Sequence, residues 1–229
     1  MRLLTVSLAL AVAVSACGSF EDDPAENESP VEETPTPEAS PAPFEAWCQV
    51  DVVGVGTLDM EEDYLPHVIQ CENDGAGPEA LKAQAVSARS YAYYKIEDSG
   101  SVTDGQGDQV YSCNKTPEQR HYDAAAATAG QFFMYEDTVV AAFYVAGSDP
   151  DDRDTCIADS CDPDQTNTEK YVTYNEGLSG DDLEQTTLGW VNPQNWANRG
   201  CMSQWGSRCL DQRGDGFDTI ARFYYGQDI

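Results

Sequence analysis

The sequence predicts an α+β fold for residues 45–229. Helical and strand-like segments alternate irregularly along this region, without the repeated strand–helix–strand unit of a parallel α/β sheet. Residues 61–96 have the clearest helical character, and a glycine-rich turn at 73–77 divides them into a short and a long piece. We therefore expect a single domain with a mixed sheet, a pair of unequal helices and loops held by disulfides.

The helix pair within residues 61–96 is indicated by its start signals and by one apolar stripe. Asp63 is predicted to cap the short helix 64–71, and Pro78 suits the first turn of the long helix. The stripe of the long helix consists of Leu81, Ala85, Ala88, Ala92 and Ile96. Because small residues let neighbouring backbone approach closely, we expect Glu72, at the end of the short helix, to be partly buried. Burial raises the pKa of a carboxyl group and can suit it to acid catalysis.

The remaining elements are predicted from local periodicity and from the positions of glycine and proline. The expected helices cover 78–97, 117–130, 202–212 and 217–225, and the expected strands cover 50–58, 131–135, 138–145 and 170–174, with weaker strand potential near 108–111. The strands on either side of Glu136-Asp137 are interpreted as a hairpin, with Phe132, Met134 and Phe143 available for its core face.

The N-terminal segment has the pattern of a bacterial lipoprotein signal, which we assign to residues 1–16. Arg2 supplies a short positive region, residues 3–14 are apolar but too short to cross a bilayer, and Val14-Ser15-Ala16-Cys17 has the pattern of a lipobox. Cys17 is therefore the expected lipidation site, and an ordinary signal peptide cleaved nearby is the alternative. The expected location is the cell envelope, anchored to a bacterial membrane. In a Gram-negative cell the outer membrane or periplasm is favoured, because no Asp follows Cys17.

The composition bounds the kinds of partner. Residues 17–44 are predicted to form an acidic, proline-rich tether, because they lack the large apolar residues that a packed core needs. The whole chain has a formal net charge of -29 at pH 7. A field of that sign disfavours nucleic acid, whose binding depends on Lys and Arg against phosphate. It also disfavours polyanionic wall polymers, whereas a neutral sugar chain is not repelled.

The cysteines predict disulfides, because an exported protein folds in an oxidising compartment. The sequence has eight of them, Cys17, Cys48, Cys71, Cys113, Cys156, Cys161, Cys201 and Cys209. If Cys17 carries lipid, seven remain and at most three bridges form. Cys156–Cys161 and Cys201–Cys209 are plausible local pairs, although spacing leaves the connectivity open.

No cofactor or metal is expected. Cysteines with His67 or His121 are an alternative zinc site, but CxxC and HxxxH spacings are absent from the sequence. The acidic loop at 147–169 is an alternative calcium site, but Arg153 stands where an EF-hand would have a ligand. A GxSxG nucleophile motif is also absent from the sequence.

Motifs along the chain carry a family resemblance. They are Glu62-Asp63-Tyr64-Leu65, Cys71-Glu72, the run EALKAQAVSARSYA at 79–92, Gln109-Val110-Tyr111, the run AAATAG at 125–130, the run MSQWG at 202–206 and the run IARFYYG at 220–226. In order and spacing they resemble the SpoIID/LytB family of peptidoglycan lytic transglycosylases and amidase enhancers, from about residue 50 to the end. The resemblance implies an enzyme that cleaves peptidoglycan glycan strands, preferably those stripped of stem peptides.

The same resemblance assigns roles to individual residues. It implies that Glu72 is the catalytic acid, acting alone because the C6 hydroxyl of the sugar attacks the anomeric carbon in a lytic transglycosylase. The other residues that it places at the substrate are Arg89, Tyr91, Asn198, Ser203, Gln204 and Trp205. Of these, Arg89 is expected to brace the site. The alternative for Glu72 is a helix-end carboxylate or an ion-pair partner of Lys82 or Arg89.

Two segments depart from the family pattern and keep other functions open. Asn198 stands at a His position, Cys201 at a Gly position, and residues 147–151 replace an S-G-G segment. One alternative is a non-catalytic glycan-binding module that activates or recruits a cell-wall amidase. Another is a structural envelope lipoprotein held by disulfides. A Cys71–Cys201 bridge would join the two halves of the predicted site.

Overall fold

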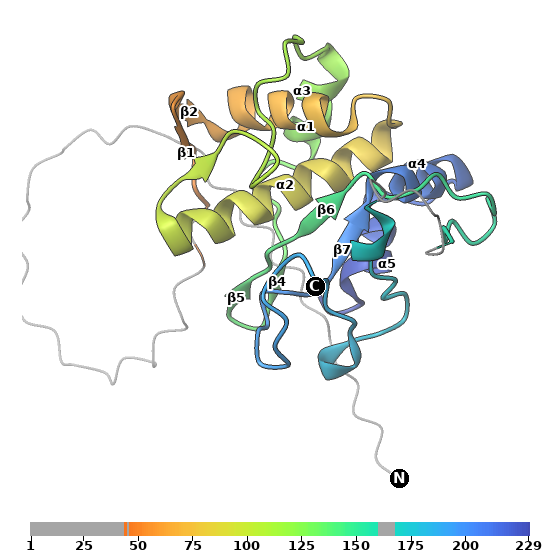
Figure 1. Ribbon diagram of the computed structural model, residues 1–229. Helices are drawn as coiled ribbons and strands as arrows, with labels where there is room; N and C mark the ends of the chain where they lie inside the picture. Colours follow the sequence, from red (N-terminus) through yellow and green to blue (C-terminus); the bar gives the residue numbers. More distant parts are fainter. Residues whose placement is uncertain (1–43, 45, 160–167) are drawn as a thin grey trace, which may run out of the picture. The chain divides into compact units, whose positions relative to one another are not determined.

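The computed structural model describes residues 44, 46–159 and 168–229, and Trp47–Ile229 form one compact unit. The predicted signal, Cys17, nearly all of the tether, and Cys161 lie outside the described residues. The unit has an α+β fold, as predicted (Figure 1). Its strands are β1 (Gln49–Val53), β2 (Gly56–Asp59), β3 (Val102–Thr103), β4 (Met134–Tyr135), β5 (Thr138–Val139), β6 (Phe143–Val145) and β7 (Cys201–Ser203). Its α-helices are α1 (Leu65–Asn73), α2 (Pro78–Ser99), α3 (Gln119–Ala127), α4 (Gln204–Arg213) and α5 (Phe217–Tyr225).

Helix α2 is the element against which most of the others pack. Figure 1 shows it crossing the middle of the unit, with α1 and α3 on one side and β6, α4 and α5 on the other, and α2 contacts all five. It begins at Pro78, as predicted. Gly100 ends it in the left-handed conformation (φ 78°), with its N–H bonded to the carbonyl of Ile96 at 2.9 Å. Most side chains from Ala80 to Tyr93 are buried, so α2 positions its neighbours on several faces.

The strands form three small sheets. β1 pairs antiparallel with β2 and parallel with β3, which gives the predicted mixed sheet, and β4 pairs antiparallel with β5. β6 and β7 form a parallel pair in which Phe143 lies opposite Cys201 and Val145 opposite Ser203. This pair brings residues far apart in the chain to one place, directly before the start of α4.

The structure corrects the predicted start of the first helix. Asp59, and not Asp63, is the capping residue, because its carboxylate accepts hydrogen bonds from the N–H groups of Glu61 (3.0 Å) and Glu62 (2.8 Å). A π-helical turn, η1 (Met60–Tyr64), leads from this cap directly into α1. The helical backbone thus begins one turn earlier than predicted, and Asp63 lies inside it.

Three strand predictions are wrong, and one residue that was predicted to be helical lies in a strand. The segment 170–174 is not a strand and overlaps the 3₁₀ turn η2 (Glu169–Tyr171). The predicted hairpin is only β4–β5, because β6 pairs with β7 instead of continuing it. Met202, predicted as helical, therefore lies in a strand. The potential near 108–111 is realised only as an isolated bridge between Asp104 and Gln109. Sequence periodicity cannot identify a strand partner that lies elsewhere in the chain.

The predicted core face of the hairpin is also partly wrong. Phe132, Met134 and Phe143 are only half-buried, whereas Phe133 is 9% exposed and belongs to the core between α2, α4 and α5. The predicted strand at 50–58 divides into β1 and β2 around Gly54, whose φ of 83° turns the chain.

The disulfides differ from every predicted pair. Cys71 is bonded to Cys113 and Cys156 to Cys209, each with Cα atoms 5.6 Å apart. The pairs Cys156–Cys161, Cys201–Cys209 and Cys71–Cys201 are therefore wrong, because in each case at least one cysteine is bonded elsewhere. Cys201 is a buried free thiol in β7. The fold selects partners that are distant in sequence, and spacing carries no information about them.

Candidate functional site

The carboxylate of Glu72 lies where three segments of the chain meet. Glu72 is in the last turn of α1, which ends at Asn73, two residues beyond the predicted range 64–71. Its Oε1 accepts a hydrogen bond from the backbone N–H of Val110 at 2.8 Å, and its Oε2 accepts one from Nε2 of Gln204 at 3.2 Å. The end of α1, the loop after β3 and the start of α4 therefore converge on one carboxyl group.

The surroundings of Glu72 raise its pKa above the ordinary value. Burial is the largest cause, because it disfavours the charged form, while the hydrogen bonds from Val110 and Gln204 act in the opposite direction by stabilising the carboxylate. The alternative in which Glu72 is an ion-pair partner of Lys82 or Arg89 is wrong. Those cations bond Glu79 and Glu61 instead. The carboxyl group of Glu72 is thus protonated more readily than that of an ordinary glutamate, and its hydrogen bonds hold it in one orientation.

A buried amide, Gln109, fixes the loop that presents the Val110 N–H. The Gln109 side chain accepts a hydrogen bond from the hydroxyl of Tyr64, and its Nε2 donates to the carbonyl of Ala88 (3.1 Å) and to the hydroxyl of Tyr144 (2.8 Å). Gln109 is only 1% exposed. The amide thereby ties η1, α2 and β6 to the backbone beside Glu72.

The two tyrosines at this amide remain neutral phenols. Burial raises the pKa of Tyr64, with charges of Asp108 and Glu72 adding to the effect. Burial likewise raises the pKa of Tyr144, and the charge of Glu72 is the next cause. Both hydroxyls therefore stay protonated, so Tyr64 keeps its hydrogen bond to Gln109 and neither tyrosine adds charge beside the carboxyl group.

The rest of the loop at 104–113 is anchored independently. The carboxylate of Asp104 accepts from the N–H groups of Tyr111 (2.9 Å) and Ser112 (3.1 Å). The hydroxyl of Tyr111 donates to Asp63 at 2.9 Å, and the Cys71–Cys113 disulfide joins the loop to the residue next to Glu72. The loop is held at both of its sides, so the N–H of Val110 stays directed at the carboxylate.

The start of α4 positions two of the predicted substrate residues. Ser203 is the N-cap of α4, and its hydroxyl accepts from the N–H of Gly206 (3.0 Å) and donates to the carbonyl of Ala146 (3.4 Å). Gln204, directly after it, is 7% exposed and reaches Glu72. Gly147 has a φ of 66°, and a Cβ atom there would lie 2.1 Å from Oγ of Ser203, so this close approach requires glycine.

The other predicted site residues lie at different distances from this centre. Tyr91 is joined to it indirectly, because its hydroxyl donates to Asp108 at 2.9 Å, beside Gln109. Arg89 is fully buried in an ion pair with Glu61, and its guanidinium also donates to the carbonyl of Gln131 (2.8 Å). It joins α2 to Glu61 in η1 and to the backbone after α3. The side chain of Asn198 is bonded to the backbone of Thr186, so it holds a loop.

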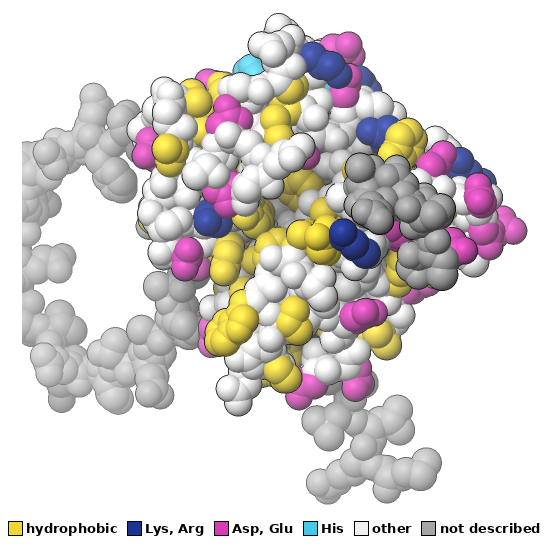
Figure 2. All heavy atoms as spheres, viewed as in Figure 1, with side chains coloured by type: hydrophobic (Ala, Val, Ile, Leu, Met, Phe, Trp, Pro, Cys, Tyr) yellow, Lys and Arg dark blue, Asp and Glu magenta, His cyan; other side chains and the backbone are white. Residues whose placement is uncertain are grey.

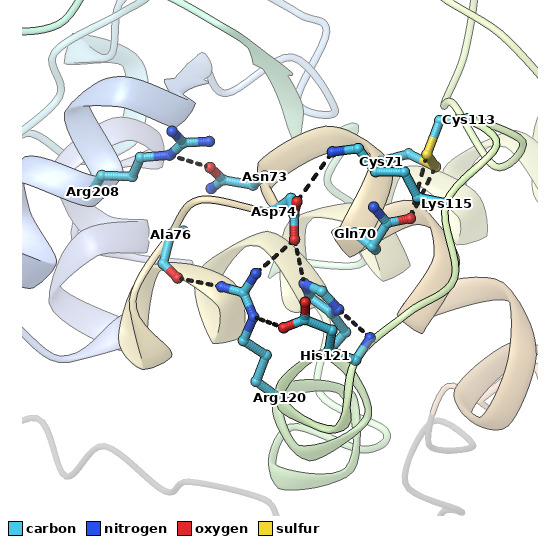
Figure 3. Close-up of polar contacts among 11 residues, drawn as sticks. Gln70, Cys71, Asn73, Asp74, Ala76, Cys113, Lys115, Arg120, His121 and Arg208 are labelled. Atoms are coloured by element: carbon cyan, nitrogen blue, oxygen red, sulfur yellow. Dashed lines mark hydrogen bonds and ion pairs between the residues drawn. A yellow bond between two sulfur atoms is a disulfide. The ribbon is translucent and has the colours of Figure 1, made fainter.

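A second contact between α1 and α4 lies next to the Glu72–Gln204 contact. Oδ1 of Asn73 accepts from Nε of Arg208 at 2.8 Å (Figure 3). The guanidinium of Arg208 also lies 4.6 Å from the ring centroid of Trp205. Trp205 is 41% exposed. Figure 3 also shows the carboxylate of Asp74, directly after α1, in contact with Lys115, Arg120 and His121.

Sequence reasoning did not commit to several of these residues. Gln109 and Val110 stand in a motif that the family resemblance includes, so a signal for them existed. Tyr144 and Arg208 carry no motif, and only the packing of β6 and α4 brings them to the site. The Val110 contact is made by a backbone N–H, which has no side-chain signature at all.

The surface around these elements is apolar at its middle and acidic toward its edge. Figure 2 shows hydrophobic side chains gathered across the face that contains α2 and β6, with most acidic side chains near the margin. Within residues 44, 46–159 and 168–229, His, Cys, Asp and Glu side chains form no group of three or more that would hold a metal ion. No helix in this part of the chain is both long enough and apolar enough to cross a membrane.

Comparison with protein families gives one match that covers the region of Glu72. Residues 50–135 match the SpoIID family, described as Stage II sporulation protein. The resemblance found in the motifs is thereby confirmed over β1 to β4, including α1, α2 and the loop of Val110. This match is consistent with a role related to the cell wall. Comparison with curated proteins gave no match.

Proposed function

We propose, from the premise that residues 50–135 match the SpoIID family, that the protein is a lytic transglycosylase of peptidoglycan glycan strands. Glu72 is its single acid and base. The observation that carries the proposal is the environment of this carboxyl group, which is buried, has a raised pKa and is oriented by Val110 and Gln204. General acids in enzymes combine such a raised pKa with a fixed orientation.

The proposed reaction needs only one carboxyl group. Protonated Glu72 donates its proton to the glycosidic oxygen, and the bond from that oxygen to the anomeric carbon breaks. The C6 hydroxyl oxygen of the same sugar bonds to the anomeric carbon and closes a 1,6-anhydro ring. The hydroxyl proton passes to the Glu72 carboxylate, which restores the acid, and no water is consumed.

The hydrogen bonds at Glu72 suit both halves of this cycle. The N–H of Val110 and the amide of Gln204 stabilise the carboxylate that forms after the first proton transfer. Burial favours the protonated form that begins the next turnover. The two effects oppose each other, so the proton can be given up and recovered at one site.

The proposal extends to location and substrate. Lipid attachment at Cys17 would hold the protein at a bacterial membrane within the cell envelope, with the acidic tether spanning the distance to the wall. The substrate is the glycan strand, preferably freed of stem peptides. Of the predicted substrate residues, Trp205 has the exposed ring that a sugar face can cover.

The test is product analysis after incubation of the pure protein with peptide-free glycan strands. The wild type should release products ending in 1,6-anhydro sugars, detected by mass spectrometry. Glu72→Gln should bind the strands and release none, because an amide cannot donate the proton. Glu97→Gln is the control, because it removes an exposed carboxylate near the C-terminal end of α2, and this variant should cleave normally.

Two outcomes would overturn the assignment. Cleavage by Glu72→Gln at the wild-type rate would show that another group is the acid. Glycan binding without cleavage by the wild type, with cleavage appearing only when a cell-wall amidase is added, would favour the amidase-activating module. If the wild type bound no glycan, a structural envelope lipoprotein would be the remaining one of the functions considered.

A further inference from the structure

Arg208 is a cation that the fold orders without giving it a carboxylate partner. Its Nε donates to Asn73, but in the part of the chain that the structure describes neither terminal nitrogen makes a hydrogen bond or ion pair. Figure 3 shows those two nitrogens at the end of the side chain, beyond the bond to Asn73. In a chain with a net charge of -29, an ordered guanidinium with unused donors is unexpected.

The carboxylates nearest to Arg208 are already bonded to other cations. Asp74 and Asp149 are close enough to act electrostatically on it. However, Asp74 pairs with Arg120 at 2.6 Å and Lys115 at 3.1 Å. Asp149 pairs with Arg153 at 2.9 Å. The donors of Arg208 are therefore not claimed by its acidic neighbours.

An aromatic ring packs against the guanidinium of Arg208, and a glycine leaves room for it. The ring of Trp205 lies against one side, at 4.6 Å from its centroid. Gly75 lies close by, and a Cβ atom at that position would be 2.9 Å from Nη1 of Arg208. The absence of a side chain at Gly75 thus makes room for the guanidinium. A planar cation fixed in this way presents its paired donors in the geometry that a carboxylate accepts.

The cation lies beside the proposed acid. Gln204 and Arg208 are four residues apart on α4, so their side chains share one face and are separated by about 6 Å along the helix. Gln204 contacts Glu72, and Arg208 contacts the next residue, Asn73. The two contacts join successive residues of α1 to α4, so the side chain of Arg208 lies next to the Glu72–Gln204 contact.

We propose that Arg208, supported by Trp205, binds a carboxylate of the substrate, namely the free lactyl carboxylate of a muramic acid unit that carries no stem peptide. The inference rests on the proposed function and adds its specificity. In a peptide-bearing unit that lactyl group is an amide, which has no charge to pair with a guanidinium. Because the rest of the protein is strongly acidic, a substrate carboxylate is repelled elsewhere and requires this local cation.

The experiment measures binding in the Glu72→Gln protein, so that the strands stay intact. Three ligands are compared by isothermal titration: peptide-free glycan strands, the same strands with their carboxylates converted to amides, and peptide-bearing strands. The peptide-free strands should bind about tenfold more tightly than the amidated ones, the effect of one charge-assisted hydrogen-bonded pair. Adding Arg208→Gln should abolish this preference, and adding Arg208→Lys should retain part of it. Arg213→Gln, which removes an exposed arginine that pairs with Asp215 and with neither acidic neighbour of Arg208, should leave the preference unchanged.

The outcomes separate this proposal from the one that it rests on. Equal binding of amidated and unmodified strands by Glu72→Gln would overturn it without any change at Arg208, so a folding defect of the variant cannot obscure the result. If a folded Arg208→Gln variant kept the preference for unmodified strands, the proposal would also be wrong. The same holds if Arg208→Gln weakened binding only of peptide-bearing strands, because their carboxylates lie on the peptide. A carboxylate preference without anhydro products from the wild type would support Arg208 and overturn only the transglycosylase.

Discussion

Replacing Gln109 with leucine tests whether the buried amide is the support of the site. The substitution keeps the approximate size of the side chain but removes its hydrogen bonds to Tyr64, Ala88 and Tyr144. The carbonyl of Ala88 lies inside α2 and keeps the hydrogen bond of the helix itself. The two phenol hydroxyls are left unpaired in the interior, and each costs ~1–3 kcal/mol.

The expected loss of stability follows from these terms. The unpaired hydroxyls together cost about 2–6 kcal/mol, and the gain from burying leucine offsets about 1 kcal/mol of this. We expect Gln109→Leu to lower the free energy of unfolding by about 1–5 kcal/mol. The same variant should cleave glycan strands more slowly, because the N–H of Val110 loses the anchor beside it.

The assay is equilibrium unfolding in urea with the disulfides intact. Gln119→Leu is the matched control, because Gln119 bonds only an exposed carboxylate of Asp123 on the surface of α3. It should change stability by less than about 0.5 kcal/mol. If the two variants lose equally little, the tyrosines find other partners and Gln109 is not the support that its contacts indicate.

Two further predictions concern Glu72 and the disulfide beside it. Because burial raises the pKa of Glu72 in the folded state, the folded protein binds this proton more tightly than the unfolded chain, and stability falls as the pH rises from ~4 through the raised pKa. Glu72→Gln removes the cost of ionising this buried carboxyl group. The free energy of unfolding of the variant relative to wild type, measured in urea, should therefore increase with pH over this range and then level off. If that relative stability did not change with pH, the raised pKa would be contradicted. Replacing Cys71 and Cys113 together with serine should cost about 2–4 kcal/mol in thermal unfolding and reduce glycan cleavage, because the bridge anchors the loop of Val110. Stability lost with full cleavage retained would show that the other anchors of the loop are sufficient.

Local signals in the sequence were enough for the long helices. Pro78 begins α2 as predicted, and the predicted end at residue 97 lies two residues before the observed end at Ser99. The helix at Phe217–Tyr225 likewise agrees with the range predicted from periodicity. The short elements were not, because strands of two or three residues carry too little pattern to distinguish them from loops.

The sequence by itself determined the α+β class, the central helix, the family resemblance over residues 50–135 and the choice of Glu72 as the residue to examine. The tertiary structure decided what surrounds that carboxyl group. The Val110 N–H contacts it from 38 residues away, and the Cys71–Cys113 bridge holds the loop of Val110. Gln204 contacts it from 132 residues away, and Arg208 contacts the neighbouring Asn73. Such contacts form because the chain must bury apolar surface and pair its polar groups at the same time, and local sequence does not encode which distant partner satisfies both conditions.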